Sequence, residues 1–351
     1  MSPKEPKKIL IVRLSAIGDV VMASALIPSI KLKYPNAKLA WLVEPVAANL
    51  LSENPLLDEV IIWPRAQWQK LWREKRYVEW FKTVRDFIKM LRAHGFDLAL
   101  DTQGLLKSGI WAFLSGADKK VGLGSKEGTA MLMNQVVERI PDAARISSEY
   151  LAMAQSQNFD TECFNMHLPV SEQTSSTVDR LLESKGINQE KGYIVVCPFT
   201  TRPQKHWIES YWQEFFKLAQ QSQLSLVILG GPGDKPNAER IVKDAKANGI
   251  EVTDLCGETK LLEAVNVIDK ARLLVGVDTG LTHVGIAQHT PTIAIFGSTR
   301  PYTHTTRDNA QVMYTEIECA PCRRRPTCDG DFTCLKKLTA EDVWQQASAY
   351  L

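Results

Sequence analysis

Two short polar turns in this sequence combine small residues with side chains that can do chemistry. Residues 278–283 read Asp-Thr-Gly-Leu-Thr-His, and residues 15–19 read Ser-Ala-Ile-Gly-Asp. Each turn follows a run of aliphatic residues and precedes a pattern that is typical of a helix. A strand that ends in such a turn and opens a helix presents backbone N–H groups to a phosphate or a carboxylate. One turn in each half of the chain predicts two Rossmann-like domains that face one cleft.

Each turn also has a purely structural interpretation. Asp19 follows Gly18 and is either an N-cap, worth about 1 kcal/mol to the first helix, or a general base at the end of the strand. Asp278 either caps its own helix or belongs to an anion site made by the N–H groups that follow it. His283 is part of that anion site in one interpretation and packs against the core in the other.

A third polar segment, residues 198–207, directly follows the aliphatic run at 193–197. Ligands bind at the carboxyl ends of strands in open α/β sheets. Thr200 and Thr201 offer hydroxyl donors and Lys205 offers a positive charge, a combination that suits a pyrophosphate. The alternative is a solvated polar loop.

Residues 63–92 hold nine Lys/Arg against three Asp/Glu, and four of the nine tryptophans of the chain. An amphipathic helix with its indoles packed inward is one explanation. Indoles beside cations such as Arg65, Lys70 and Arg73 also suit an anionic, partly lipidic surface, because tryptophan favours such interfaces.

Four cysteines gather near the C-terminus with the spacing Cys-x2-Cys-x5-Cys-x5-Cys, and the first two have metal-like spacing. Four thiolates can close a tetrahedral structural zinc site, and four free thiols are equally compatible with the sequence. The cluster comprises Cys319, Cys322, Cys328 and Cys334.

The elements that must position these residues alternate between strand-like and helix-like patterns almost from end to end. Aliphatic runs are expected to form strands at 9–13, 39–43, 60–63 and 98–101, and the pattern restarts at 193 after a polar segment. Near-continuous aliphatic strands indicate parallel sheets covered on both faces. The fold class is therefore α/β with two doubly wound domains, at 1–170 and 171–337. A closing helix at 338–351 is expected, and one expectation is that it packs back on the N-terminal domain.

The bulk composition excludes several classes of protein. The formal net charge is only +2, with 22 Lys/Arg against 18 Asp/Glu in residues 1–170 and 20 against 22 in the rest. This balance argues against a nucleic-acid protein that relies on strong positive charge. We find no apolar run long enough to span a membrane and no signal peptide, so a cytoplasmic location is expected.

Taken together, the motifs resemble those of the ADP-heptose:lipopolysaccharide heptosyltransferases, glycosyltransferase family 9. Residues 9–21, 41–44, 101–108, 200–207 and 278–283 follow one another in the order of that family. The resemblance covers about residues 8–300 and is nearest to the members that add the first heptose to the Kdo-lipid A inner core. One segment departs from the family pattern: residues 145–149 read Arg-Ile-Ser-Ser-Glu where family members often carry His-Ala-Val-Glu/Asp-Arg. The cysteine cluster resembles a feature of many family members, but the best-known first-heptose enzymes lack it.

The resemblance implies a GT-B fold, in which the C-terminal domain binds ADP-heptose and the N-terminal domain binds Kdo-lipid A or a related lipopolysaccharide acceptor. It implies inverting transfer with Asp19 as the catalytic base, no required cofactor, no nucleic-acid partner, and work at the inner face of the inner membrane. Donor-binding positions are Thr200, Thr201, Lys205, Glu239, Asp278, Thr279, Gly280, Leu281 and His283. Acceptor-binding positions are Gly18, Arg65, Lys70, Arg73 and Lys126, the last standing where an arginine is more usual.

Three alternatives remain open at this point. A family member could act on a later heptose or on another core acceptor. A Rossmann-type oxidoreductase is disfavoured because the first turn lacks Gly-x-Gly-x-x-Gly and the near match at 122–128 has the wrong spacing. A non-catalytic nucleic-acid adaptor built on the cysteine cluster would instead show salt-sensitive RNA binding.

Overall fold

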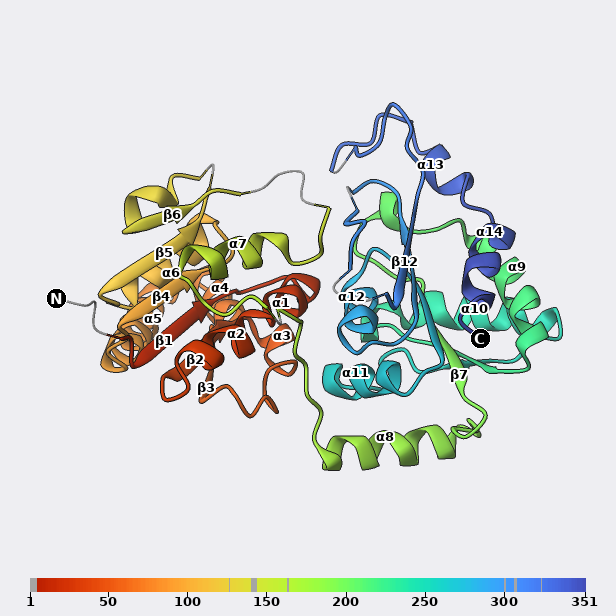
Figure 1. Ribbon diagram of the computed structural model, residues 1–351, viewed down its shortest axis with the longest axis horizontal. Coiled ribbons are helices and arrows are strands. Elements are labelled where there is room, and N and C mark those ends of the chain that lie inside the picture. The colour runs from red at the N-terminus through yellow and green to blue at the C-terminus, as the bar shows by residue number, and fades with distance from the viewer. Residues whose placement is uncertain are drawn as a thin grey trace. The chain divides into compact units, whose positions relative to one another are not determined.

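The computed structural model describes residues 5–125, 127–139, 144–162, 164–299, 301–305, 308–322 and 324–351. The chain divides into two compact units. The first unit holds the described residues of 1–143 and 147–169, and the second holds those of 144–146 and 170–351. Each unit contains a six-stranded sheet whose neighbouring strands are all parallel (Figure 1). The expected α/β class with two Rossmann-like sheets is thereby confirmed.

The first sheet has the strand order β3-β2-β1-β4-β5-β6. Its strands are β1 (Lys8–Val12), β2 (Lys38–Val43), β3 (Glu59–Ile62), β4 (Leu98–Asp101), β5 (Lys119–Leu123) and β6 (Gln135–Val137). Its helices are α1 (Ile17–Ala23), α2 (Leu26–Lys33), α3 (Pro45–Ala48), α4 (Arg65–Arg73), α5 (Tyr77–Ala93), α6 (Leu106–Leu114) and α7 (Ser148–Ser156), with the 3-10 turn η1 (Thr129–Leu132).

The second sheet has the order β12-β11-β10-β7-β8-β9. Its strands are β7 (Tyr193–Cys197), β8 (Ser225–Ile228), β9 (Val252–Asp254), β10 (Leu273–Val277), β11 (Thr292–Phe296) and β12 (Ala310–Tyr314). Its helices are α8 (Glu172–Ser184), α9 (Glu209–Ala219), α10 (Lys235–Ala247), α11 (Leu261–Asp269), α12 (Gly280–Ala287), α13 (Thr333–Lys336) and α14 (Ala340–Ser348), with 3-10 turns η2 (Pro203–Lys205), η3 (Gln220–Ser222) and η4 (Pro232–Asp234).

The two strand orders are the same once the second sheet is counted from its own first strand. In both sheets the order reverses beside the first strand, between β1 and β4 in one unit and between β7 and β10 in the other. Such a reversal leaves a crevice outside the carboxyl ends of the two strands, where ligands of open α/β sheets bind. Each unit therefore has one expected ligand position.

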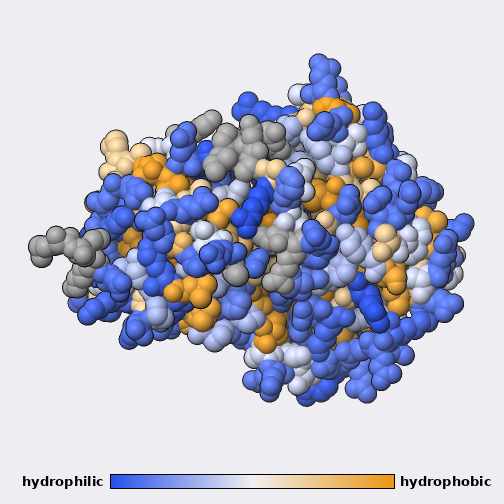
Figure 2. Space-filling view, in the orientation of Figure 1, coloured by the Kyte–Doolittle hydropathy of each residue, from blue (hydrophilic) through white to orange (hydrophobic). Residues whose placement is uncertain are grey.

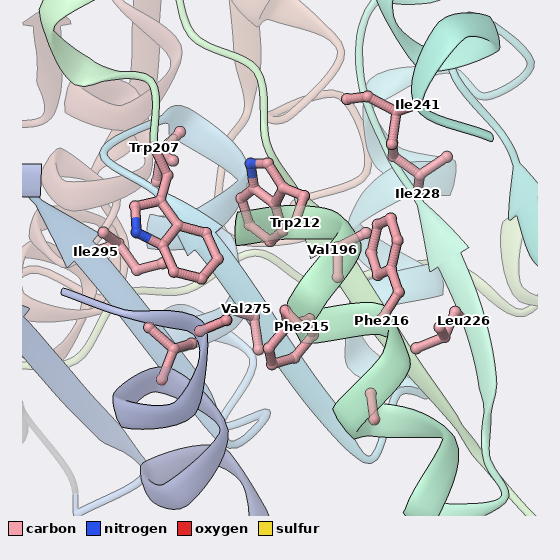
Figure 3. Close-up of a cluster of buried hydrophobic side chains, with 14 of the residues drawn as sticks. Val196, Trp207, Trp212, Phe215, Phe216, Leu226, Ile228, Ile241, Val275 and Ile295 are labelled. Atoms are coloured by element: carbon pink, nitrogen blue, oxygen red, sulfur yellow. The ribbon is translucent and has the colours of Figure 1, made fainter. Parts of the chain in front are cut away.

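Each unit buries its own hydrophobic core. In the second unit, aromatic residues of α9 such as Trp212 and Phe216 pack on alternate residues of the strands, including Val196 and Val275 (Figure 3). In the first unit, Trp68 and Trp111 pack on the strand residues that face α4, α5 and α6. Hydrophilic side chains cover most of the face drawn in Figure 2, where apolar residues form separate patches.

The closing helix α14 belongs to the second unit. Ala340, Val343 and Ala347 are buried in the core of that unit, and Trp344 contacts Phe215 of α9 with ring centroids 6.0 Å apart. The apolar face of α14 is therefore used within the C-terminal unit, and the expectation that residues 338–351 pack back on the N-terminal domain stays a prediction.

Candidate active site

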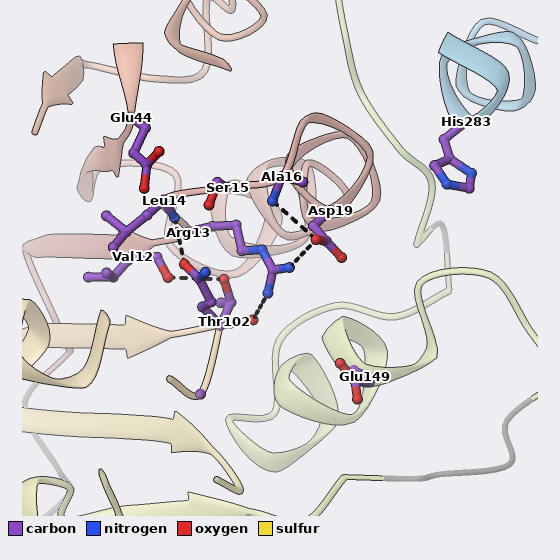
Figure 4. Close-up of polar contacts among 12 residues, drawn as sticks. Val12, Arg13, Leu14, Ser15, Ala16, Asp19, Glu44, Thr102, Glu149 and His283 are labelled. Atoms are coloured by element: carbon purple, nitrogen blue, oxygen red, sulfur yellow. Dashed lines mark hydrogen bonds and ion pairs between the residues drawn. The ribbon is translucent and has the colours of Figure 1, made fainter. Parts of the chain in front are cut away.

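Asp19 lies at the reversal point of the first sheet. It is the third residue of α1, which begins five residues after the end of β1 at Val12. Its Oδ2 accepts a hydrogen bond from the Ala16 N–H (3.1 Å) and lies 2.6 Å from the Arg13 guanidinium (Figure 4). The side chain remains 38% exposed. Asp19 therefore does contact the backbone at the start of its helix, and its carboxylate is also open to a substrate.

Arg13 is a buried cation that the sequence analysis did not single out. Its guanidinium also donates to the Thr102 carbonyl (2.8 Å) and lies 5.7 Å from the centre of the Tyr150 ring. Burial disfavours its charge, but Tyr150, Asp19 and Glu149 outweigh that effect and raise the pKa of Arg13. The guanidinium holds the Asp19 carboxylate in a fixed position, and a general base must be held within reach of the proton that it takes.

The turn after β4 holds this arrangement in place. The buried Asp101 accepts the N–H groups of Gln103 and Gly104, and Gln103 in turn accepts the Leu14 N–H (3.1 Å). Gly104 has φ +64°, and a Cβ at this position would lie 2.8 Å from the Leu123 carbonyl. The segment 101–108 thus ties the end of β4 to the turn that carries Asp19.

A second polar group lies at the same edge of the first sheet. Glu44 follows β2 and is half-buried, and its Oε1 lies 3.1 Å from Lys107 of α6 and 3.2 Å from Arg65 at the start of α4. Lys107 also donates to the Ser15 hydroxyl (3.2 Å). The segments after β2, β3 and β4 therefore bring one carboxylate and two cations to the edge of the sheet at which Asp19 lies.

The other expected acceptor residues have different positions. Gly18 is the second residue of α1, beside Asp19. Lys70 and Arg73 are exposed on α4, with Lys70 3.9 Å from Glu74. Arg65 and these two residues lie on one helix, but only Arg65 joins the Glu44 group. Lys126 lies outside the described residues.

The second unit has its polar centre at the reversal point between β7 and β10. Asp278 follows β10 and is buried, and its Oδ2 lies 2.6 Å from Lys205, which follows β7. Its Oδ1 lies 3.7 Å from the Nε2 of His283, and Thr299 donates a hydrogen bond to the carboxylate. Burial raises the pKa of Asp278, but His283, Lys205 and these hydrogen bonds together lower it below its ordinary value.

Two residues of this centre, Thr299 and Tyr302, were not predicted. Tyr302 is buried, and its hydroxyl lies 2.8 Å from His283 Nδ1. The His283 ring therefore lies between the Asp278 carboxylate and the buried Tyr302 hydroxyl. The signal available in the sequence was that polar residues 298–299 follow the aliphatic strand β11.

The remaining expected donor residues differ in how they relate to Asp278. Thr200 is half-buried and donates to the Asp278 carbonyl (3.3 Å), whereas Thr201 is exposed. Thr279 is the N-cap residue of α12, so the first N–H groups of that helix, from Gly280 and Leu281 onward, have no acceptor within the helix. Glu239 is exposed on α10, and within the described part of the chain it makes no contact with the Asp278 centre.

The structure does not support a metal site in the cysteine cluster. Among the described residues, no three His, Cys, Asp or Glu side chains gather as ligands. Cys334 is buried in the core of the second unit, whereas Cys319 is exposed, and all four are free thiols. The possible zinc site at Cys319, Cys322, Cys328 and Cys334 is therefore not supported, because the fold uses Cys334 as a small core residue.

No helix among the described residues is both long and apolar enough to cross a membrane.

Comparison with known proteins identifies the family. Residues 84–331 match the family model described as glycosyltransferase family 9 (heptosyltransferase). The chain is 27% identical over 341 residues to lipopolysaccharide heptosyltransferase 1 of Pseudomonas aeruginosa, covering 95% of this chain and 89% of the relative. A family 9 glycosyl transferase structure from Veillonella parvula aligns with a TM-score of 0.82 at 17% identity, covering 98% and 97%. Escherichia coli heptosyltransferase WaaC with ADP-2-deoxy-2-fluoro heptose aligns with a TM-score of 0.71 at 24% identity, covering 96% and 98%.

These structures carry the GT-B arrangement that the sequence analysis expected, and the family model covers well over half of the chain. The protein is therefore an enzyme that transfers glycosyl groups, and it belongs to glycosyltransferase family 9, the heptosyltransferase family.

Proposed function

We propose that this enzyme transfers L-glycero-D-manno-heptose from ADP-heptose to the Kdo region of the lipopolysaccharide inner core, with inversion and with Asp19 as the general base. One observation carries the proposal: an accessible carboxylate lies at the carboxyl end of β1, 2.6 Å from a buried, fixed arginine. The similarity to lipopolysaccharide heptosyltransferase 1 of P. aeruginosa and to WaaC with ADP-2-deoxy-2-fluoro heptose supports the sugar and its nucleotide carrier. Family membership disfavours the oxidoreductase and the nucleic-acid adaptor.

The proposed reaction is a single displacement. An acceptor hydroxyl attacks the anomeric carbon of the heptose while Asp19 takes its proton, and the bond from that carbon to the diphosphate oxygen breaks. ADP leaves with both bonding electrons, and the new glycosidic bond forms on the opposite face of the sugar. Arg13 does not touch the substrate in this scheme; it holds the Asp19 carboxylate in place.

On the donor side, the departing diphosphate gains negative charge. Lys205, the hydroxyls of Thr200 and Thr201, and the N–H groups at the start of α12 would stabilise that charge. Asp278 holds Lys205 at 2.6 Å and thereby sets the position of its ammonium group. No step of the proposal passes through a metal ion, because cations and dipoles of the chain offset the charge.

On the acceptor side, Arg65, Lys70, Arg73 and Lys126 would bind the acidic inner core. The acceptor is lipid-linked, so we place the enzyme at the inner face of the inner membrane.

The direct test measures ADP release from ADP-heptose with a panel of truncated lipopolysaccharides. We expect turnover with an acceptor that ends in Kdo and lacks heptose. Turnover only with an acceptor that already carries heptose would replace the proposal by a later step of core assembly. If ADP-heptose gave no ADP release with any of the acceptors, and a different nucleotide sugar served as the donor instead, the proposal would be overturned.

A further inference from the structure

An exposed apolar surface lies where α4 ends and α5 begins. Trp72 (54% exposed), Tyr77 (49%), Val78 (85%) and Phe81 (68%) form what we call the aromatic tip. Of the four tryptophans in residues 63–92, Trp63 and Trp68 are buried in the core. Trp72 points outward, so inward packing accounts for only part of the pattern.

The tip is a preformed surface. The Trp72 ring contacts those of Tyr77 and Trp80, with centroids 5.0 and 5.2 Å apart, and the Trp80 ring also contacts Phe81. Beneath it, Trp68 packs edge-on against Phe87 in the core. Two packed helices therefore hold the aromatic side chains of the tip at the surface.

The charge around the tip is strongly positive. Residues 65–85 hold seven Lys/Arg against two Asp/Glu. Both acids, Glu74 and Glu79, pair with Arg76. Within the described part of the chain, no carboxylate lies within ion-pair distance of Lys75 or Lys82, both of which are exposed, although Lys82 interacts electrostatically with Glu79.

This combination fits one occupant better than the others. Aromatic and apolar side chains ringed by Lys and Arg are typical of surfaces that insert shallowly into an anionic bilayer. A second copy of the chain would place like charges opposite one another, and protein interfaces are depleted in lysine. We propose that the aromatic tip docks the enzyme on an anionic phospholipid membrane, an inference that extends the proposed lipid-linked acceptor to a specific surface.

The test is sedimentation of the full-length protein with phosphatidylcholine vesicles that contain about 30 mol% phosphatidylglycerol. We expect Val78→Ser/Phe81→Ser and, separately, Lys75→Ala/Lys82→Ala to weaken vesicle binding about tenfold or more, because the first loses apolar insertion and the second loses attraction to anionic lipid. Only the lysine-dependent part should diminish at high salt. All four residues are exposed, so folding should be kept.

Matched controls come from exposed residues elsewhere. Leu32→Ser/Met131→Ser removes equally exposed apolar side chains, and Lys243→Ala/Lys246→Ala removes two exposed cations of α10. Both should bind vesicles like the wild type. Transfer to a soluble, delipidated acceptor should be unchanged in Val78→Ser/Phe81→Ser, which separates docking from chemistry.

Wild-type vesicle binding by the tip variants would overturn the inference. The inference would also fail if the tip variants lost only self-association on gel filtration, which would assign the tip to a second copy of the chain. It would fail likewise if they lost only the binding of a protein partner. If the wild type binds vesicles through the tip but transfers no heptose, the docking surface stands and the proposed function fails.

Discussion

Asp278→Asn removes the charge that holds Lys205 in the second unit. The two charged groups are 2.6 Å apart, with side chains only 9% and 17% exposed. At an effective dielectric constant of about 20, their attraction is about 6 kcal/mol before desolvation is subtracted. Removing one member of a buried pair typically costs about 3–5 kcal/mol. Because Lys205 can turn partly to solvent, we expect the lower end, about 3 kcal/mol of unfolding free energy.

Equilibrium urea unfolding of the full chain measures this cost, with the transition of the second unit fitted separately if two appear. Lys205→Met should cost a similar amount, and the double variant should cost about 2 kcal/mol less than the sum of the two. Glu209→Gln, which breaks an exposed pair of 2.7 Å with Arg240, is the control and should cost less than about 0.5 kcal/mol. Additive single effects, or a cost for Asp278→Asn as small as the control, would refute the reasoning.

The pH dependence gives an independent check on the same carboxylate. Because the pKa of Asp278 is lowered in the folded protein, its contribution to stability is present above the unfolded pKa of about 3.9. That contribution is lost as the pH falls through the lower, folded pKa. The stability difference between the wild type and Asp278→Asn should therefore shrink on acidification below about pH 4 and stay constant from there to neutrality.

The same centre should control the donor. Lys205→Ala should weaken binding of ADP and ADP-heptose and lower turnover further, because charge on the diphosphate grows in the transition state. Thr201→Ala should be milder, since a hydroxyl carries no charge. Calorimetry and steady-state kinetics measure the two effects, and unchanged kinetics in Lys205→Ala would move the donor phosphates elsewhere.

Two further predictions concern the acceptor and the thiols. Replacing Arg65, Lys70 and Arg73 together by Ala should raise the acceptor KM by about tenfold or more, if each exposed contact is worth about 1 kcal/mol. The KM for ADP-heptose should stay near normal. Lost donor affinity with normal acceptor binding would reverse the assignment of donor and acceptor to the two halves of the chain. Burial strongly raises the pKa of the Cys197 thiol. Iodoacetamide at pH 8 should therefore label the exposed Cys319 in the native protein and spare Cys197, which mass spectrometry of peptides can measure. Equal labelling of the two cysteines would contradict the burial of Cys197.

The sequence allowed much of the fold to be predicted, because its central strands are almost purely aliphatic. The strands at 9–13 and 98–101 were expected, and they correspond to β1 and β4. β5 and the edge strands β6 and β12 were missed, and the reason is plainest for the two edge strands. They are short or half-exposed, with mixed side chains, so their pattern does not stand out from that of a loop.

The candidate site was predicted less completely, for physical reasons. Residues in turns directly after strands, such as Asp19 and Asp278, could be found because the topology places strand ends together. Arg13 was missed because a buried cation becomes intelligible only when its partners, far apart in the sequence, are known. The cysteine spacing suggested metal, but spacing does not reveal that Cys334 belongs to a core.

Asp19→Asn tests the central claim most directly. The amide keeps the shape of the side chain, and its oxygen can still accept from Ala16 and Arg13, so the fold and donor binding should be preserved. An amide cannot take the acceptor proton, so heptosyl transfer should fall about 10²–10⁴-fold while the Kd for ADP-heptose changes only about two- to threefold. Asp86→Asn, a change of an exposed acid in the same unit, should leave both quantities unaltered. Wild-type turnover in Asp19→Asn would show that Asp19 only caps its helix and would contradict the account.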